Sequence, residues 1–377
     1  MNFNFKFSTI VSFGLNSRLE INEIVKEYDF KSICLVIDHA LKDVSIINDF
    51  IEKIESEVVV VYCDISEPTY DKLEQKRLEV SNLSLDAFIG IGGGSAIDMA
   101  KGLSVLKTNL EPAIKYRGFN KYSNTPLPVI AIPTTAGTGS EITPNASFID
   151  SNEKKKLGIN GEGIRPKHAL IDPELTLSCP LAPTISAGVD SLVHATEAFV
   201  AKKTNPMARI FSKEGFKLVI DSLPMLSNDL NNIKLREKVM YGAFLSAIAL
   251  MNSGTGPAAA LSYPLGVHFG VPHGLGGAIF LPHVIEHNIS MGYLDYGNIY
   301  NFNSGSDSEI FLAEKLLGKI FDTWDILKIS KNLGDHGVKT EHIEMIKLET
   351  LDLIGALEQN PVPFFEKEIE KTLNKLI

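Results

Sequence analysis

The sequence is poor in cysteine and has no long apolar run. Its 377 residues include three cysteines, Cys34, Cys63 and Cys179, whose wide spacing matches no metal-binding pattern and whose odd number disfavours a disulfide framework. No stretch approaches the roughly eighteen apolar residues of a membrane span. The N-terminal MNFNFKFSTIVSFG lacks the continuous apolar core of a secretory signal. We therefore expect reduced thiols in a cytoplasmic protein.

Basic residues are also in deficit. The chain has 36 Lys and Arg against 46 Asp and Glu, which gives a net charge of −10. Nucleic acids and anionic membranes are polyanions, so this balance argues against both as partners. The length exceeds the size at which one hydrophobic core usually keeps growing, so two domains are expected.

The first half of the chain alternates short β-branched runs with segments of helical periodicity. The runs are residues 33–37, 58–62, 87–91 and 129–132. Near-continuous apolar strands separated by helices indicate a parallel sheet that is covered on both faces. We predict a doubly wound α/β domain here.

After about residue 180 the sequence changes to longer stretches with a 3.6-residue period. These stretches predict an all-helical region, and they cover residues 185–201, 206–225, 235–252 and 345–358. Three prolines between residues 173 and 183 mark the boundary, because proline interrupts regular structure. We predict an α/β domain over residues 1–180 and a helical domain over residues 181–377, with ligands bound in a cleft between the two.

A glycine turn lies between a predicted strand and a predicted helix. In FIGIGGGSAIDMAK, Gly92, Gly93 and Gly94 let the backbone approach a pyrophosphate, whose charge the following helix N-terminus stabilises. Ser95 stands where the usual G-x-G-x-x-G pattern would have its last glycine. A tight turn without any ligand is the alternative interpretation.

A second loop, PTTAGTGSE, also follows an apolar strand and concentrates hydroxyl side chains that can donate to a ribose, phosphate or carboxamide. Asp38 ends an earlier strand, where a carboxylate can accept hydrogen bonds from an adenosine ribose and repel a 2′-phosphate. This favours NAD over NADP. A carboxylate at a strand end can equally be a helix cap.

Three residues suggest a metal site. Asp190 and His194 lie one helical turn apart in AGVDSLVHATEAF, and His273 stands in the Pro-His-Gly of GVPHGLGG. A carboxylate and an imidazole at i and i+4 project from one helix face, and a distant histidine can complete a three-ligand divalent site. An ordinary surface pair is the alternative, but the neighbouring residues are small and apolar, where an unpaired carboxylate is costly. Glu197 is a candidate partner of a ligand.

Taken together, these segments resemble the iron-dependent (group III) alcohol dehydrogenase family. The matching motifs are GGGSAIDMAK, PTTAGTGSE, DPEL, AGVDSLVHATEAF, and YPLG followed by VPHGLGGAIFLPHVIEHN, and they cover nearly the whole chain in order. The resemblance implies a dinucleotide-binding N-terminal domain and a helical metal-binding, catalytic domain. It also implies oxidation of alcohols or reduction of aldehydes by a homodimer.

The resemblance assigns roles residue by residue. The implied NAD contacts are Asp38, Gly93, Gly94, Ser95, Asp98, Thr134, Thr135, Thr143 and Lys156. The glycine turn would hold the pyrophosphate, the threonines would line the nicotinamide side, and Asp38 matches the carboxylate of NAD-preferring members. Asp190, His194 and His273 match three ligands of one Fe²⁺ or Zn²⁺ ion, and this ligand set does not choose between the two metals.

Two positions depart from the family. The family has a fourth histidine ligand fourteen residues before His273 and a proton-relaying histidine ten residues before it, where this chain has Ala259 and Tyr263. Three ligands still suffice, because an open position admits substrate. Tyr263 and His268 are the candidates for proton relay, and His268 is also a less favoured extra ligand. Tyr263 is a poor base at its usual pKa near 10 unless the metal lowers it.

Other histidines and other functions remain as alternatives. His268 can also be a simple packing residue, and His283 and His287 are weaker candidates still. The altered ligand block looks most like the divergent branch that includes 3-deoxy-manno-octulosonate 8-oxidases, which implies oxidation of the terminal alcohol of an acidic sugar. One rival is a lyase or cyclase of the dehydroquinate synthase type, and the other is a catalytically degenerate NAD-binding protein.

Overall fold

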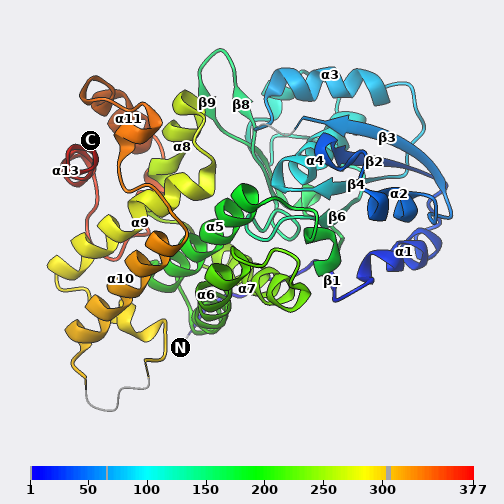
Figure 1. Ribbon diagram of the computed structural model, residues 1–377. Helices are drawn as coiled ribbons and strands as arrows, with labels where there is room; N and C mark the ends of the chain where they lie inside the picture. Colours follow the sequence, from blue (N-terminus) through cyan, green and yellow to red (C-terminus); the bar gives the residue numbers. More distant parts are fainter. Residues whose placement is uncertain (1, 65–66, 303–306) are drawn as a thin grey trace. The chain divides into compact units, whose positions relative to one another are not determined.

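The protein is described here from a computed structural model that covers residues 2–64, 67–302 and 307–377. The chain forms two compact units (Figure 1). One is Ser8–Cys179, and the other is Pro180–Ile377 together with the segment that ends at Phe7. The division expected from sequence assigns residues 2–7 to the α/β domain. In the structure Lys6 N donates to Asn252 Oδ1 at 2.7 Å, which ties this segment to the helices.

The α/β unit is built on a six-stranded parallel sheet with the order β1-β11-β6-β4-β2-β3. The four predicted runs form β2 (Ser32–Asp38), β3 (Glu57–Cys63), β4 (Ala87–Gly92) and β6 (Val129–Pro133). The prediction missed β1 (Ile10–Phe13) and β11 (His168–Ile171). Parallel pairing brings the carboxyl ends of β2, β4 and β6 to one edge, where both loops singled out in the sequence begin.

Helices cover both faces of this sheet. Cys34 and Val36 pack into one core with α3 (Tyr70–Val80) and α4 (Gly94–Thr108). Their neighbours along β2 point to the opposite face, because successive strand residues alternate. There Ile33, Leu35 and Ile37 pack with α1 (Ile21–Glu27) and α2 (Ser45–Ile51). The predicted doubly wound α/β architecture is confirmed.

Short strands complete the unit. β5 (Gly118–Phe119), β10 (Ile159–Asn160) and β7 (Asn145–Ala146) form a three-stranded sheet. β8 (Ile149–Asp150) and β9 (Lys155–Lys156) form a two-stranded antiparallel pair. Two-residue strands are too short for a periodic signal, so the sequence did not predict them.

The second unit is helical, as predicted, and its described residues contain no strand. Its helices are α5 (Leu181–Val200), α6 (Pro206–Leu226), α7 (Ile233–Met251), α8 (Pro257–Phe269), α9 (His273–Ser290), α10 (Glu309–Ile326), α11 (Ile343–Leu351), α12 (Ile354–Leu357) and α13 (Glu366–Leu376). The predicted helix 345–358 is divided into α11 and α12. No described helix is long and apolar enough to span a membrane.

The junction between α8 and α9 has clear local causes. Pro257 begins α8, where the missing N–H costs nothing because it would have no helical partner. Gly270, in the left-handed region at φ +66°, ends this helix. Pro272 then precedes His273, the first residue of α9. His273 therefore has a fixed place on the first turn of a helix.

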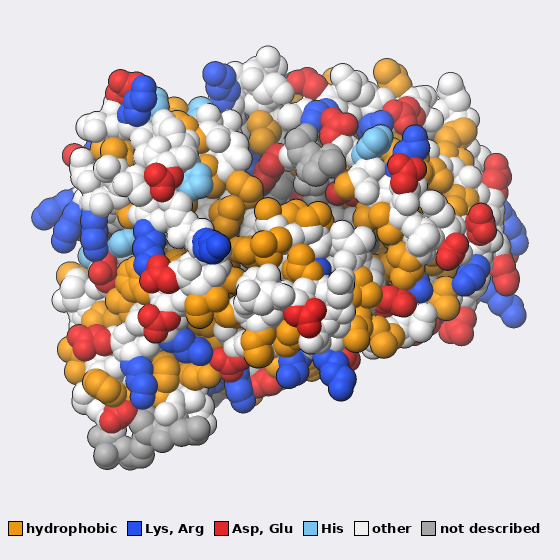
Figure 2. Space-filling model, viewed as in Figure 1, with side chains coloured by type: hydrophobic (Ala, Val, Ile, Leu, Met, Phe, Trp, Pro, Cys, Tyr) orange, Lys and Arg blue, Asp and Glu red, His pale blue; other side chains and the backbone are white. Residues whose placement is uncertain are grey.

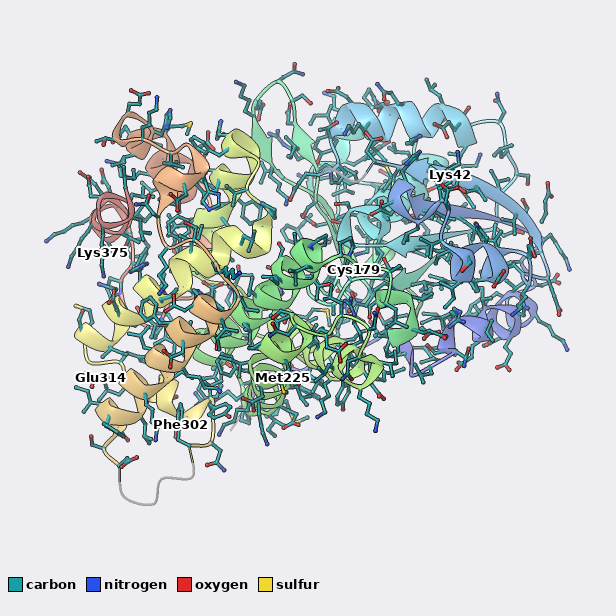
Figure 3. The ribbon with its side chains drawn as sticks, viewed as in Figure 1. Lys42, Cys179, Met225, Phe302, Glu314 and Lys375 are labelled. Carbon is teal, nitrogen blue, oxygen red and sulfur yellow. The ribbon has the colours of Figure 1, made fainter. Side chains whose placement is uncertain are left out.

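The cysteines are all free, as expected. Cys34 and Cys63 are buried, and burial raises the pKa of each thiol to about 12, so both stay protonated and unreactive. Cys179, labelled in Figure 3, is partly buried. Acidic and basic side chains are interspersed over the face of the molecule that Figure 2 shows.

Candidate functional site

Asp190, His194 and His273 come together in the helical unit. Their ligand atoms all lie within 4.8 Å of one another. Asp190 Oδ1 is 3.5 Å from His194 Nε2 and 3.9 Å from His273 Nε2. Two donor atoms bound at about 2.1 Å to one tetrahedral ion lie about 3.4 Å apart. These two separations are close to that value, so the donor set fits one divalent cation.

The three side chains of this cluster differ in their exposure to solvent. The Asp190 and His194 side chains are only 5% and 6% exposed, whereas that of His273 is 24% exposed. A carboxylate with so little access to water is costly unless a cation or hydrogen bonds compensate it. Among the described residues, His194 Nδ1 has no hydrogen-bond partner, and its Nε2 faces the carboxylate. The cluster therefore has a closed side formed by α5 and a partly open side at His273.

Glycines allow the helices that carry these residues to approach each other. A Cβ on Gly274 would lie 2.1 Å from the carbonyl oxygen of Ser186 and 2.7 Å from Asp190 Cβ. A Cβ on Gly276 would lie 2.9 Å from Ser262 Cβ on α8. The glycines after His273 thus permit the first turn of α9 to pack directly against α5 and α8, and this contact places His273 beside Asp190.

Glu197 has a role that the sequence did not specify. Its carboxylate accepts hydrogen bonds from the backbone N–H groups of Gly256 at 2.7 Å, Ala258 at 2.7 Å and Ala259 at 3.3 Å. A carboxylate at a helix N-terminus satisfies free donors and interacts favourably with the helix dipole. Burial nevertheless raises the pKa of Glu197 to about 7. Glu197 therefore anchors α8 to α5.

The two residues predicted for proton relay lie in different surroundings. The ring of Tyr263 meets the ring of His273 edge to face, with 5.0 Å between the centroids. His268 Nε2 instead pairs with Glu349 at 2.8 Å and 3.0 Å from the two carboxylate oxygens. The structure thus brings Tyr263 to the cluster, while His268 lies against α11 and outside the three-residue group found among the described residues.

The remaining candidates near this cluster are occupied elsewhere or carry no donor. His283 Nδ1 contacts Glu286 at 3.2 Å, and His287 Nε2 contacts the carbonyl oxygen of Pro363 at 2.9 Å. Ala259, at the position of the family's fourth ligand, is a buried alanine in the first turn of α8. Its methyl group offers no atom to a metal.

The glycine turn of the α/β unit joins β4 to the N-terminus of α4. A Cβ on Gly92 would lie 2.9 Å from Asp38 Cβ, and one on Gly94 would lie 2.8 Å from Thr138 Oγ1. Gly92 also has φ +148°, which favours glycine. Packing alone therefore requires two of these glycines. The 15-residue helix α4 still presents its free N–H groups beside Gly93 and Ser95, as an anion site needs.

Asp38 and the threonine loop lie next to this turn. Asp38 Oδ1 accepts the backbone N–H of Ala40 at 3.0 Å, so it caps a short helical turn. Thr134 N donates to Gly92 O at 2.9 Å, which holds the second loop against the first. The hydroxyl oxygen of Thr143 accepts a hydrogen bond from Lys101 Nζ at 3.5 Å.

A buried polar network supports the threonine loop, and sequence reasoning missed most of it. Asp98 accepts hydrogen bonds from Ser140 Oγ at 2.5 Å and Ser147 N at 2.8 Å. Lys101 Nζ donates to Ser140 Oγ at 2.8 Å and Asn145 O at 2.7 Å. Burial lowers the pKa of Lys101 to about 8 and raises that of Asp98. Each oxygen of Asp98 thus accepts one hydrogen bond that holds the loop in place.

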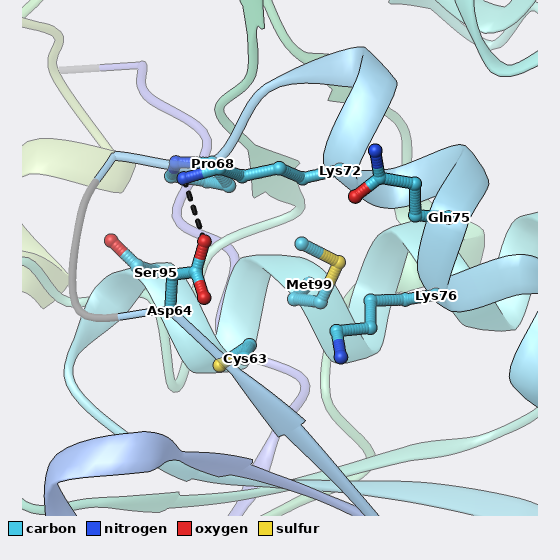
Figure 4. A pocket seen from close by; sticks show the side chains of 8 residues that line it. All are labelled: Cys63, Asp64, Pro68, Lys72, Gln75, Lys76, Ser95 and Met99. Atoms are coloured by element: carbon cyan, nitrogen blue, oxygen red, sulfur yellow. Dashed lines mark ion pairs between the residues drawn. The ribbon is translucent and has the colours of Figure 1, made fainter.

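A small cavity of about 100 Å³ opens beside Ser95 (Figure 4). Lys72 and Lys76 from α3 line it, and Lys72 Nζ forms an ion pair with Asp64 at 2.9 Å. Lys156, expected to contact the cofactor, pairs with Glu67 at 2.5 Å. The spacing of charges in the sequence gives no signal for the Glu67 pairing, because 89 residues separate its partners.

Comparison with known proteins agrees with this organisation. Residues 8–173 match the family described as iron-containing alcohol dehydrogenase, and residues 184–377 match the C-terminal part of the Fe-containing alcohol dehydrogenase family. The NAD-dependent methanol dehydrogenase of Bacillus methanolicus is 33% identical over 264 residues, which is 69% of each chain. The 1,3-propanediol dehydrogenase of Citrobacter freundii is 29% identical over 97% of each chain.

Solved structures give the same result for the fold. The crystal structure of a 1,3-propanediol oxidoreductase superposes with a TM-score of 0.93 at 26% identity and covers all of both chains. The sequence motifs, the two units and the matches over both halves all agree, and the chain belongs to the iron-containing alcohol dehydrogenase family.

Proposed function

We propose that this protein is a metal-dependent, NAD-linked alcohol dehydrogenase that interconverts a primary alcohol and its aldehyde. The observation that carries the proposal is the convergence of Asp190, His194 and His273 in a site with one partly exposed side. Relatives named as methanol and propanediol dehydrogenases support the same reaction class.

The three residues would hold one Fe²⁺ or Zn²⁺ ion through one carboxylate oxygen and two imidazole nitrogens. When bound, the ion supplies Lewis-acid polarisation of the substrate oxygen. Ala259 offers no donor at the position of the family's fourth ligand, and among the described residues only Asp190, His194 and His273 come together as such a group. Three protein ligands leave a position for the substrate oxygen, as in catalytic metal sites generally.

The α/β unit would bind NAD along the carboxyl edge of its sheet. The N–H groups at Gly93, Gly94 and Ser95 suit a pyrophosphate, because they begin a long helix. Thr134, Thr135 and Thr143 would face the nicotinamide from the loop that Asp98 and Lys101 hold. Lys156 would contact the cofactor from β9.

Asp38 would select NAD. Its carboxylate lies at the end of β2 beside Gly92, where it can accept hydrogen bonds from an adenosine ribose and repel a 2′-phosphate. The capping bond to Ala40 uses Oδ1, and a carboxylate has further acceptor sites. Replacing Asp38 by glycine is therefore expected to raise the relative use of NADP.

Tyr263, whose ring packs against His273, would relay the proton of the alcohol: its hydroxyl oxygen would accept that proton while its own hydroxyl proton passes on to solvent. The hydrogen-bonded His268 and Glu349 pair is the second candidate for the relay. We propose a primary alcohol as the substrate class, and the terminal C8 hydroxyl of 3-deoxy-manno-octulosonate as the first specific compound to examine. The loss of both usual histidines at 259 and 263 is what sets this chain apart and motivates that choice.

The deciding experiment is NADH formation at 340 nm by metal-free protein, with and without added Fe²⁺ or Zn²⁺. The panel contains methanol, 1,3-propanediol, longer primary alcohols and acidic eight-carbon sugars, with NADP as a parallel cofactor. Metal-dependent turnover that His273→Ala abolishes is the expected result. NAD binding without turnover on any alcohol would favour a degenerate protein, and product formation without net NADH would favour a lyase or cyclase.

We also propose that the protein is a homodimer, as the family resemblance implies. Sedimentation equilibrium of the full chain, whose mass is 41.3 kDa, tests this directly. A single species at twice that mass is expected, and a species of 41.3 kDa at micromolar concentration would contradict it.

A further inference from the structure

We propose that Ser262 is a positioning residue that fixes the tautomer and the direction of His273, so that Nε2 of His273 presents its lone pair to the metal. This inference rests on the proposed function, since it assumes a metal at Asp190, His194 and His273. Ser262 was not among the residues that the sequence singled out. It lies on α8, fully buried, and its hydroxyl oxygen is 2.6 Å from Nδ1 of His273.

The proton positions follow from counting donors. Ser262 Oγ is also 2.6 Å from the backbone carbonyl oxygen of Ala259. A carbonyl oxygen only accepts, so the single hydroxyl proton of Ser262 must point to Ala259. The contact with His273 is then a hydrogen bond only if Nδ1–H donates to the serine oxygen. A neutral His273 with its proton on Nδ1 has its lone pair on Nε2, the atom that faces Asp190 Oδ1 at 3.9 Å.

Packing keeps this hydrogen bond short. Gly276 has no side chain where a Cβ would lie 2.9 Å from Ser262 Cβ, so α8 and α9 meet closely at this point. The ring of Tyr263 packs edge to face on the ring of His273, at 82°. The imidazole is thus held at Nδ1 by Ser262 and contacted by the ring of Tyr263.

The two histidine ligands differ in this respect. His194 is buried by its surroundings on α5, and its Nδ1 has no hydrogen-bond partner among the described residues. His273 has a side chain that is 24% exposed, so its orientation depends more on specific contacts. Because position 259 is alanine, each of the three ligands contributes a larger share of metal binding than it would in a four-ligand site. Orienting His273 through its second nitrogen therefore has a larger effect here than in a four-ligand site.

The test compares Ser262→Ala with Ser246→Ala. Ser246 is an equally buried helical serine on α7, and its hydroxyl donates to the carbonyl oxygen of Gly242 at 2.9 Å. Both variants lose one buried hydroxyl, but only Ser262 contacts a proposed ligand. Metal-free proteins are titrated with Co²⁺, and binding is followed by the visible absorption of the bound ion. Thermal unfolding of the metal-free proteins shows whether each variant is folded.

We expect Ser262→Ala to bind Co²⁺ about 10- to 100-fold more weakly, the usual effect of removing a partner that orients a histidine ligand. Ser246→Ala is expected to bind within twofold of the unchanged protein. The ¹⁵N shifts of His273 in the Zn²⁺-loaded protein supply a signature that a packing role would not change: Nδ1 protonated, with slow proton exchange that Ser262→Ala accelerates.

Three results overturn the proposal. Ser262→Ala can bind Co²⁺ as tightly as the unchanged protein, both serine variants can weaken binding equally, or the ¹⁵N spectrum can show Nε2 protonated. The proposed function fails separately if His273→Ala binds Co²⁺ as well as the unchanged protein. If His273→Ala loses the ion and Ser262→Ala keeps it, the proposed metal site is supported and the proposed role of Ser262 is contradicted.

Discussion

Two histidines five residues apart, His268 and His273, have opposite surroundings. His268 is in the last turn of α8, and its Nε2 is paired with the carboxylate of Glu349. His273 is the first residue of α9, and its Nε2 faces Asp190, which also faces His194. One histidine belongs to a satisfied pair, and the other belongs to a cluster whose donors point at a common centre. Gly270, in the left-handed region between them, ends α8, so the two histidines belong to different helices.

The largest expected effect comes from His273→Ala. Removing one of three ligands is expected to weaken metal binding at least about 100-fold and to lower NAD-linked alcohol oxidation about 1000-fold, because Lewis-acid stabilisation is worth several kcal/mol. The matched change is His268→Ala, which should leave metal affinity within about threefold. Equal loss of metal by both variants would remove the distinction between the two histidines. Metal analysis after gel filtration and NADH formation measure both effects.

Tyr263→Phe separates proton transfer from metal binding. If the hydroxyl relays the alcohol's proton by passing its own proton on to solvent, its loss should lower kcat about 100-fold, the scale of general acid–base catalysis. The phenyl ring can still pack against His273, so Co²⁺ affinity should change by less than about threefold. Steady-state kinetics with Co²⁺ titration distinguish the two. An unchanged kcat in Tyr263→Phe would contradict this role and favour the His268 and Glu349 pair as the proton relay.

Gly274→Ala tests the helix contact that brings His273 to Asp190. The added methyl group would meet the Ser186 carbonyl oxygen at 2.1 Å, so α9 must shift, at an expected cost of about 2 kcal/mol. Metal affinity should fall as well. Gly318→Ala on α10 is the control, because an added Cβ would meet no atom within 4 Å outside the adjoining backbone of its own helix, and alanine favours helix by about 0.5–1 kcal/mol. Urea unfolding followed by circular dichroism compares them, and similar behaviour of both variants would contradict the account.

Glu349→Gln should have the smallest effect. The His268 and Glu349 side chains are 15% and 22% exposed, and a partly exposed pair of this kind contributes about 1 kcal/mol or less. Metal affinity should not change. A loss of bound metal in Glu349→Gln, measured by the same Co²⁺ titration, would mean that this pair belongs to the metal site.

Much of the α/β unit could be predicted because its strands are buried on both faces. Residues 33–37 of β2 are apolar without interruption, so the run itself identifies the strand. β1 and β11 have only four residues each, and none of the residues of β1 is fully buried, which gives a weaker pattern. Helices of the second unit were harder to predict from the sequence where they carry the proposed site. α9 contains Gly274, Gly276 and Pro282, residues that disfavour helix, and two of them are there for close packing.

In the candidate site, too, local patterns could be predicted and contacts between distant residues could not. The i, i+4 spacing of Asp190 and His194 is local and could be seen in the sequence. The contacts of Ser262 with His273 and of His268 with Glu349 depend on how α8 packs on α9 and α11, which no local spacing encodes. The contact of Asp98 with the cofactor stays a prediction, and its hydrogen bonds to Ser140 and Ser147 likewise depend on tertiary packing.

The most direct test of the central claim is an anomalous difference map from crystals of the Zn²⁺-loaded protein, collected at the zinc absorption edge. We predict one strong peak per chain, bounded by a carboxylate oxygen of Asp190 and by Nε2 of His194 and of His273, at about 2.0–2.2 Å from each. A fully loaded crystal with no peak among these three residues, or with its peak beside His268 and Glu349, would contradict the account.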